Sequence, residues 1–383
     1  MPIAIRPEIV MARGAGSYLW DTEGRRYLDL VQGWAVNCLG HAPPRVAAAL
    51  AEQARTLLNP SPSFYNPRYL DLAAAVARHT GLDHVFFTST GAEANEGAIK
   101  LARKWGSMAR QGAYQIITFV NAFHGRTLAT MSASGKPGWD RLFEPKVAGF
   151  KKVPANDLQA LRAAIDDDTV AVMLEPIQGE VGVIPISIDN LRAIRALTEE
   201  RGILFIADEV QTGVGRTGTF LCVDHAGVRP DIVTLAKGLG GGVPIGALVA
   251  RREVSVFAPG DQGGTYNGNP LVCAAALAVL EEVTAPGFLE RVRENGAFLA
   301  EGLAVLSRRL GLGEVRGAGL LLALDLDAPR AEKVVALARE RGLLVNAPRP
   351  QTLRFMPALN VSREELREAI AILESVLQDP ASR

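Results

Sequence analysis

The sequence is poor in the features that mark secreted, metal-binding and membrane proteins. Its three cysteines lie far apart and form neither a disulfide framework nor a metal-binding spacing, so we expect a reducing, cytoplasmic setting. The five histidines show no pairing at ligand spacing, and we predict no metal site. The amino terminus lacks the apolar segment of a signal peptide, and the longest apolar stretches are too short and alanine-rich to span a bilayer. We therefore expect neither secretion nor membrane insertion.

The chain also lacks an excess of charge of either sign. Its 41 basic residues balance 41 acidic ones, and no long run of like charge occurs, so neither nucleic acid nor an anionic membrane is an expected partner. With 383 residues, of which 48% are hydrophobic and 21% charged, the chain is long enough to bury one large core and a smaller domain.

Apolar periodicity alternates between helical and strand-like segments along most of the chain. An early hairpin is predicted around the turn signal at 21–24. Helical periodicity marks 45–58, 68–79, 92–110, 158–165 and 191–201, and strand-like runs mark 84–87, 115–120, 170–174, 203–207, 232–235 and 245–250. This alternation predicts an α/β fold in which helices sandwich a parallel or mixed sheet.

The pattern changes after about residue 285. A long helix, strands near 315–326 and 352–355, and a final helix at 363–377 follow. We expect residues 46–285 to form a large domain. Residues 1–45 and 286–383 are then expected to combine into a smaller α+β domain.

Two apolar runs deliver a carboxylate and an amine to one edge of the predicted sheet. The run 202–207 stops at Asp208, and the run 231–236 stops before Lys237, as buried parallel strands do at their carboxyl ends. Pyridoxal phosphate requires such a pair, because the lysine forms a Schiff base and the carboxylate keeps the pyridine nitrogen protonated. Each residue alone has an ordinary interpretation, since strand-end carboxylates cap helices and lysines before glycines are usually solvated.

Two loops that precede helices suit the phosphate of such a cofactor. Residues 88–95 follow a strand, where exposed amides and the positive helix end favour an anion, although Thr90 and Glu93 also make an ordinary helix cap. Residues 263–270 form a tight loop that offers a further phosphate contact through Thr265, or is only a turn.

The segment 123–128 follows another strand and carries an aromatic ring and a cation. Phe123 is placed to stack on a flat ring, and Arg126 to reach a substrate carboxylate, although a lone arginine is usually a surface charge.

Residues 213–218 match the dinucleotide fingerprint Gly-x-Gly-x-x-Gly, which would indicate a nicotinamide enzyme. In a true fingerprint the first glycine ends the strand and the third opens a helix. Here residues 208–212 intervene, residues 219–223 lack helical periodicity, and no second unit with a ribose-binding acid follows. We therefore disfavour the dehydrogenase interpretation.

An ordered set of motifs resembles the class III pyridoxal-phosphate aminotransferases, and within them most of all the acetylornithine aminotransferases. The match runs from about Gly14 to Pro357, and its motifs are 90–95, 123–127, 175–180, 208–213, Lys237 and Thr265. The resemblance implies the aspartate-aminotransferase-like fold, known as fold type I. It also implies a homodimer whose active sites lie at the interface.

The resemblance implies a role in cofactor binding for several residues. Lys237 would form the Schiff base and move protons, Asp208 would pair with the ring nitrogen, and Gln211 with the ring hydroxyl. Val210 and Phe123 would sandwich the ring. Phosphate contacts would come from Thr90, Gly91 and Ala92, and from Thr265 of the neighbouring subunit.

The resemblance also assigns substrate contacts. Arg126 would bind the distal carboxylate of either substrate and Arg354 the α-carboxylate of glutamate or 2-oxoglutarate. Glu180 would pair with Arg354 as a counter-ion that moves aside when glutamate binds.

Four positions bear on which amino donor fits. Gly33 stands where ornithine aminotransferases have a bulky tyrosine and so leaves room for an N-acyl group, while Trp34 lines the pocket or belongs to the core. Gly264 and Val181 depart from the family pattern: the first removes a hydrogen bond to the donor, and the second narrows the pocket slightly.

The expected reaction moves the terminal amine of N2-acetyl-L-ornithine to 2-oxoglutarate, giving N-acetylglutamate 5-semialdehyde and L-glutamate, in arginine biosynthesis. Other ω-aminotransferases remain open as alternatives, acting on succinyl-diaminopimelate, aminoadipate semialdehyde, ornithine or 4-aminobutyrate. Outside the class, the alternatives are a nicotinamide enzyme and a catalytically idle dimer.

Overall fold

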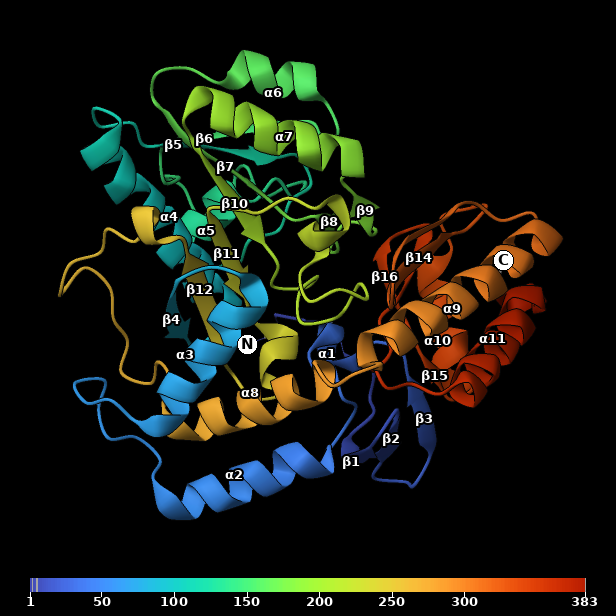
Figure 1. Cartoon of the computed structure of the whole chain (residues 1–383). Coiled ribbons are helices and arrows are strands. Elements are labelled where there is room, and N and C mark those ends of the chain that lie inside the picture. The colour runs from blue at the N-terminus through green and yellow to red at the C-terminus, as the bar shows by residue number, and fades with distance from the viewer. Residues whose placement is uncertain (2, 5, 383) are drawn as a thin grey trace.

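The computed structural model describes residues 1, 3–4 and 6–382, and its centre is a seven-stranded sheet (Figure 1). Residues 2, 5 and 383, which fall in the predicted smaller domain, lie outside the described residues. The strand order is β4-β12-β11-β10-β7-β5-β6. The strands are β4 (His84–Thr88), β5 (Gln115–Phe119), β6 (Phe150–Val153), β7 (Thr169–Leu174), β10 (Leu204–Asp208), β11 (Ile232–Leu235) and β12 (Gly246–Ala250).

The sheet is mixed because β12 runs antiparallel to both of its neighbours, whereas the other pairings are parallel. Both faces are buried, which explains the unbroken apolar runs of the central strands. In β10, Leu204 and Ile206 pack into one core, while Phe205 and Ala207 pack into the other. The predicted parallel or mixed sheet is confirmed, and the strand ends that carry chemistry share one edge.

Helices cover both faces of this sheet. One face packs against α4 (Gly91–Ala109) and α5 (Leu128–Ala133), and the other against α3 (Pro67–Thr80), α6 (Leu158–Ala164), α7 (Ile188–Arg201) and α8 (Pro270–Val283). The long α2 (Pro44–Thr56) lies against α8, as Figure 1 shows. Asn66, Thr90, Ser187 and Asn269 cap the helices that they precede, each accepting a bond from a first-turn amide.

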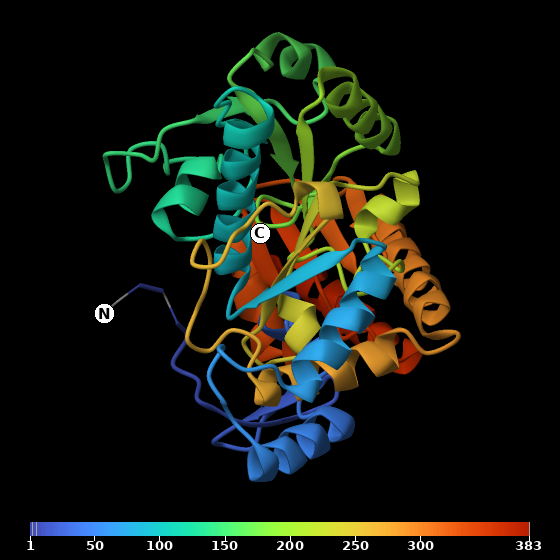
Figure 2. The same cartoon turned by 60° about the vertical axis from the view of Figure 1, so that its left-hand side comes forward.

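The carboxyl-terminal part forms a separate antiparallel sheet backed by three helices, seen in orange and red in Figure 2. Its strands follow the order β13-β14-β17-β16 and comprise β13 (Val315–Ala318), β14 (Leu321–Asp325), β16 (Asn346–Arg349) and β17 (Thr352–Phe355). The helices are α9 (Phe288–Leu310), α10 (Ala331–Glu340) and α11 (Arg363–Gln378).

The amino-terminal strands join this carboxyl-terminal part. The predicted hairpin is confirmed as β2 (Tyr18–Asp21) and β3 (Arg26–Asp29), with β1 (Met11–Ala15) beside β2. Strand β15 (Leu343–Leu344) pairs in parallel with β3. Two chain segments more than 300 residues apart therefore share one sheet.

The remaining elements are short. They are α1 (Gln32–Ala35), β8 (Ile177–Gln178), β9 (Ile184–Pro185) and the 3-10 turns η1 (Cys222–Ala226), η2 (Lys237–Gly240), η3 (Arg252–Val254) and η4 (Pro380–Ser382). Residues 213–218 form turns that open no helix, so the match to the dinucleotide fingerprint is accidental. Within the described residues no single helix is long and apolar enough to cross a membrane; α8 and α9 pass that test only together, as a pair bent by 72°, by length and composition alone.

Candidate active site

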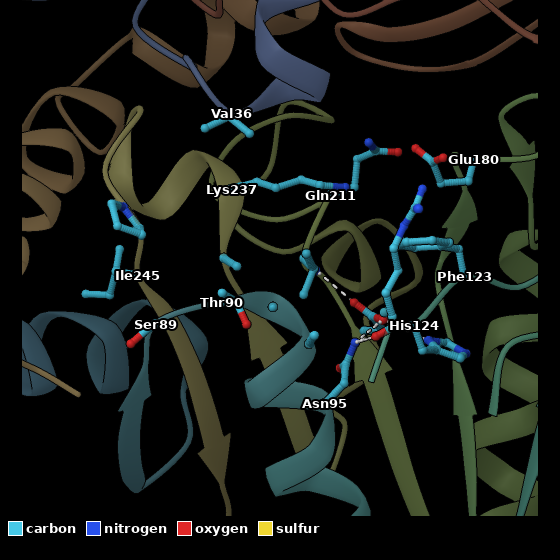
Figure 3. A pocket seen from close by; sticks show the side chains of 18 of the residues that line it. Val36, Ser89, Thr90, Asn95, Phe123, His124, Glu180, Gln211, Lys237 and Ile245 are labelled. Atoms are coloured by element: carbon cyan, nitrogen blue, oxygen red, sulfur yellow. Dashed lines mark hydrogen bonds and ion pairs between the residues drawn. The ribbon is translucent and has the colours of Figure 1, made fainter. Parts of the chain in front are cut away.

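A cavity of about 470 Å³ lies at the sheet edge where β4, β10 and β11 end. Ten of the predicted site residues line it: Thr90, Gly91, Ala92, Phe123, Arg126, Glu180, Asp208, Val210, Gln211 and Lys237. Figure 3 shows Ser89, Thr90 and Ile245 on one side, Phe123 and Glu180 on the other, and Lys237 between them. Residues from five separate segments of the chain thus converge on one cavity.

The Asp208 carboxylate is held in a fixed orientation at the end of β10. Its Oδ2 accepts hydrogen bonds from Asn95 Nδ2 at 2.7 Å and from His124 Nδ1 at 2.8 Å, and its Oδ1 accepts from the Val210 amide at 3.1 Å. Thr234 donates to Asn95 Oδ1 at 2.7 Å and so fixes the amide in turn. Three donors therefore hold a buried carboxylate that faces the cavity.

Lys237 follows β11 and reaches into the cavity without a hydrogen bond or ion pair to any residue that the structure describes. Burial lowers the pKa of its ammonium, the nearby Arg354 adds to this, and the carboxylates of Glu180, Glu175 and Asp208 oppose it. Lowering the pKa raises the fraction of neutral amine, which is the nucleophilic form.

A second buried carboxylate, Glu175, follows β7 and lies close to the first. Its Oε1 accepts the amide hydrogen of Phe123 at 2.7 Å, which fixes the backbone that presents the Phe123 ring to the cavity. Burial raises the pKa of Glu175 well above its ordinary value, and the Asp208 carboxylate raises it further.

The opposite side of the cavity is the amino terminus of α4. Thr90 caps this helix, since its hydroxyl accepts the Glu93 amide at 3.2 Å, while the Glu93 carboxylate accepts the Ser89 amide at 2.6 Å. The predicted cap is therefore confirmed, with Glu93 reaching one residue further back than an ordinary capping box. The first amides of this 19-residue helix point toward the cavity end where an anion is favoured.

Glycine at position 91 keeps this end of the cavity free of a side chain. A Cβ on Gly91 would lie only 2.7 Å from Cγ1 of Val210 and 3.3 Å from Cβ of Ala236. The helix amides and Val210 therefore approach each other more closely than any other residue at position 91 would permit.

Glu180 and Arg354 form the ion pair that the family resemblance implied, with 3.2 Å between Oε1 and Nη1. Arg354 is 1% exposed and also donates to the Gly179 carbonyl at 2.7 Å and to Asn346 at 3.2 Å. Burial alone would raise the pKa of Glu180, but Arg354 and Lys237 outweigh it and hold that pKa below its ordinary value. The carboxylate is thus ionised beside a buried guanidinium.

Gln211 is buried beside Lys237 and packs against the backbone of Gly179. Its Nε2 donates to the Trp34 carbonyl at 3.5 Å, while its Oε1 has no hydrogen-bond partner among the described residues. A buried amide oxygen without a partner is costly, and it marks a place where a ligand hydroxyl would find an acceptor.

The other predicted site residues do not line this cavity in the single chain. Arg354 lies behind Glu180, and Gly33 and Trp34 are exposed in α1, where Trp34 is 54% exposed. Gly264 and Thr265 lie in an exposed loop, where the Thr265 carbonyl accepts a hydrogen bond from Asn59. Val181 is buried and does not line the cavity.

Asn95, His124 and Glu175 lie within the family motifs, but the sequence patterns predicted no role for them in the site. All three are buried polar residues that hold the groups facing the cavity. A usable signal existed, because polar side chains at positions beside apolar core residues need a buried partner. Their partner could not be named, since Asn95 and Asp208 lie 113 residues apart.

The cavity residues fit pyridoxal phosphate. The free amine of Lys237, the fixed carboxylate of Asp208 and the unpartnered Oε1 of Gln211 match its aldehyde, ring nitrogen and ring hydroxyl. The space left by the missing side chain at Gly91, together with the first amides of α4, matches its phosphate.

The chain belongs to the class III aminotransferase family, whose model, described as "Aminotransferase class-III", matches residues 4–377. It is therefore an aminotransferase with pyridoxal phosphate as its cofactor, and the expected fold type I architecture is confirmed.

Among known proteins, the acetylornithine aminotransferase 2 of Bordetella bronchiseptica is 57% identical over 380 residues, covering 98% of this chain and 96% of that protein. The crystal structure of N-acetylornithine aminotransferase from Stenotrophomonas maltophilia is 37% identical with a TM-score of 0.86, covering 97% of this chain and 96% of that one. The crystal structure of the ornithine aminotransferase from Toxoplasma gondii is 34% identical with a TM-score of 0.94, covering 98% of this chain and 91% of that one.

Proposed function

We propose that this aminotransferase transfers the terminal amine of N2-acetyl-L-ornithine to 2-oxoglutarate, giving N-acetylglutamate 5-semialdehyde and L-glutamate, as arginine biosynthesis requires. Relatives named acetylornithine aminotransferase support the donor. The observation that carries the proposal is that one of two arginines is paired with a carboxylate and the other is not. Arg354 is neutralised by Glu180, whereas Arg126 at the cavity has no carboxylate within 4 Å among the described residues.

One paired and one unpaired arginine suit an enzyme that must bind two different substrates in turn. The donor carries its reacting amine far from its carboxylate, so it needs one distal cation, which Arg126 supplies. Glutamate and 2-oxoglutarate carry a second carboxylate beside the reacting carbon, which Arg354 takes once Glu180 moves aside. The Glu180 pair keeps a bare guanidinium from capturing the donor in the wrong orientation.

Pyridoxal phosphate, when bound, withdraws electrons from the substrate carbon beside the nitrogen, so that this carbon releases a proton. Lys237 would hold the cofactor and carry that proton on Nζ, a role favoured by its lowered pKa. Asp208, oriented by Asn95 and His124, keeps the ring nitrogen protonated. Gln211 would bind the ring hydroxyl through its Oε1, which has no partner among the described residues.

The remaining cofactor contacts are assigned to other residues that line the cavity. Val210 and Phe123 would enclose the ring, and Thr90, Gly91 and Ala92 would bind the phosphate at the start of α4.

We propose a homodimer with shared active sites, in which Thr265 of one subunit reaches the phosphate bound by the other. Exposed aromatic side chains support an interface on this side of the chain: Phe64 is 69%, Tyr65 87% and Tyr266 68% exposed. Mixed dimers of a Lys237→Ala chain and a Thr265→Ala chain test this sharing. Shared sites give one fully wild-type site per mixed dimer and restore activity, whereas sites contained within one chain give none.

The chain divides into a large cofactor domain at residues 46–285 and a small domain built from 1–45 and 286–383. The pairing of β3 with β15 supports the union of the two termini. We also place the protein in the cytoplasm, a setting that suits three buried cysteines without disulfides.

The donor is tested by comparing kcat/KM for N-acetyl-L-ornithine and ornithine with 2-oxoglutarate as acceptor. We expect a clear preference for the acetylated donor. Gly33→Tyr should shift this preference toward ornithine by filling the acyl space, and Gly33→Ala is the matched control, because both variants place a side chain at a φ of 60°. Equal effects of the two variants, or a wild-type preference for ornithine, would overturn the assignment.

A further inference from the structure

Two cations and two aromatic rings gather beside the Arg126 end of the cavity. Phe123 and Arg126 line it, whereas Lys136 and Trp139 line a second cavity next to it. The rings of Phe123 and Trp139 lie with centroids 5.5 Å apart and planes inclined by 58°. The guanidinium carbon of Arg126 lies 5.9 Å from the Trp139 centroid. Nζ of Lys136 lies 5.4 Å from the same indole and 6.0 Å from the Phe123 centroid. The family resemblance gave Lys136 no role.

Among the residues that the structure describes, no ion pair neutralises the charge of Lys136. Within the described residues the Lys136 ammonium contacts the two rings and donates no hydrogen bond, and neither it nor the Arg126 guanidinium has a carboxylate within 4 Å. The neighbouring lysines differ, because Lys146 donates to the Trp139 carbonyl at 2.6 Å and Lys152 to the Ser132 carbonyl at 2.7 Å. Two like charges against one indole repel each other, and an anion between them would relieve that repulsion.

The field of Lys136 also reaches into the cavity. Burial raises the pKa of the Glu180 carboxyl, Arg354 and Lys237 lower it, and Lys136 is a further cation that lowers it. Lys136 is partly buried, so water screens its charge less than that of a fully exposed lysine.

We propose that Lys136 is a second cationic contact for the terminal carboxylate that Arg126 binds, and that it helps determine specificity for carboxylate-bearing substrates. This inference rests on the proposed function. The carboxylate would lie between the guanidinium and the ammonium, both of which contact the Trp139 indole. Arg126 supplies a planar contact, whereas Lys136 supplies a point charge.

The test measures single-turnover kcat and KM of holoenzyme for glutamate, N-acetyl-L-ornithine and pentylamine, a donor without any carboxylate. Lys136→Gln should raise KM about tenfold for both carboxylate-bearing donors, leave kcat nearly unchanged, and leave pentylamine unaffected. Lys136→Arg should restore most of the wild-type KM. The matched control is Arg141→Gln, which removes a charge that is 91% exposed in the same segment and should leave all three donors within about twofold.

Two results would overturn the role of Lys136. Unchanged KM values in Lys136→Gln, with the cofactor band retained, would remove it from substrate binding. An equal loss for pentylamine and glutamate would show that Lys136 acts through the shape of the segment instead. A wild-type enzyme that fails to react with glutamate would overturn the proposed function, and this assignment with it, so the two failures are distinguishable.

Discussion

Removing the carboxylate of Glu180 should change which substrate the enzyme prefers. The ion pair joins Glu180 Oε1 and Arg354 Nη1 at 3.2 Å, and the two side chains are 19% and 1% exposed. In the wild type, the α-carboxylate of glutamate must displace Glu180 before it meets Arg354. In Glu180→Ala it meets an unpaired buried guanidinium directly.

The size of the effect follows from the burial of the pair. Breaking a fully buried pair by removing one partner costs roughly 3–5 kcal/mol. Glu180 is partly exposed, and Arg354 keeps its bonds to the Gly179 carbonyl and to Asn346, so about 2 kcal/mol is a reasonable value. The ratio of kcat/KM for N-acetyl-L-ornithine to that for glutamate should therefore fall about thirtyfold.

The assay is a stopped-flow half-reaction with each donor in turn. Glu180→Gln is the informative companion, because it keeps the volume and removes the charge, and it should show most of the same shift. A ratio unchanged in both variants would refute the idea that this carboxylate gates Arg354. A shift in Glu180→Ala alone would assign the effect to the emptied space and not to charge.

Three further changes test other parts of the site. Gly91→Ala places a Cβ 2.7 Å from Cγ1 of Val210 and should weaken cofactor binding about tenfold, measured by pyridoxal phosphate titration of the apoprotein. Burial raises the pKa of Glu209 from 4.5 to about 7, so its stabilising contribution is complete below about pH 4.5 and is lost as the pH rises through 7. Glu209→Gln should flatten this fall in unfolding free energy, and an unchanged pH profile would contradict the assignment. Burial lowers the pKa of Lys237 in the folded apoprotein. The contribution of Lys237 to the free energy of unfolding is therefore complete above pH 10.5 and is lost as the pH falls toward the lowered pKa. Apo Lys237→Met should therefore unfold at a higher Tm than wild type at pH 7, with the gap closing toward pH 10.5 and no cofactor band on reconstitution.

Local sequence patterns were sufficient to predict where the chemistry lies. The apolar runs of β10 and β11 could be identified because both faces of the central sheet are buried, and their carboxyl ends deliver Asp208 and Lys237. The helix cap at Thr90 was equally local, since it joins residues three positions apart.

Contacts between distant segments could not be predicted from such patterns. The reversed direction of β12, the pairing of β3 with β15 and the clamp of Asn95 and His124 on Asp208 all depend on which segments meet in space. Alternation and capping specify an element and its buried face but not its partner.

The backbone of α1 was also beyond local prediction. Residues 32–35 all have positive φ, a left-handed turn that is unfavourable for Gln32, Trp34 and Ala35 and readily adopted only by Gly33. A single glycine does not signal such a turn. The turn leaves Gly33 and Trp34 exposed, as Thr265 and Gly264 are, so their roles stay predictions that require a second chain.

The most direct test of the account is the visible absorption spectrum of the purified holoenzyme, before and after N-acetyl-L-ornithine is added without a keto acid. The account predicts a yellow band that bleaches as the amine is transferred to the cofactor, and that returns on addition of 2-oxoglutarate. A band that persists with N-acetyl-L-ornithine but bleaches with ornithine or 4-aminobutyrate would contradict the proposed donor. No band, even after adding pyridoxal phosphate, would contradict the assignment of the cavity itself.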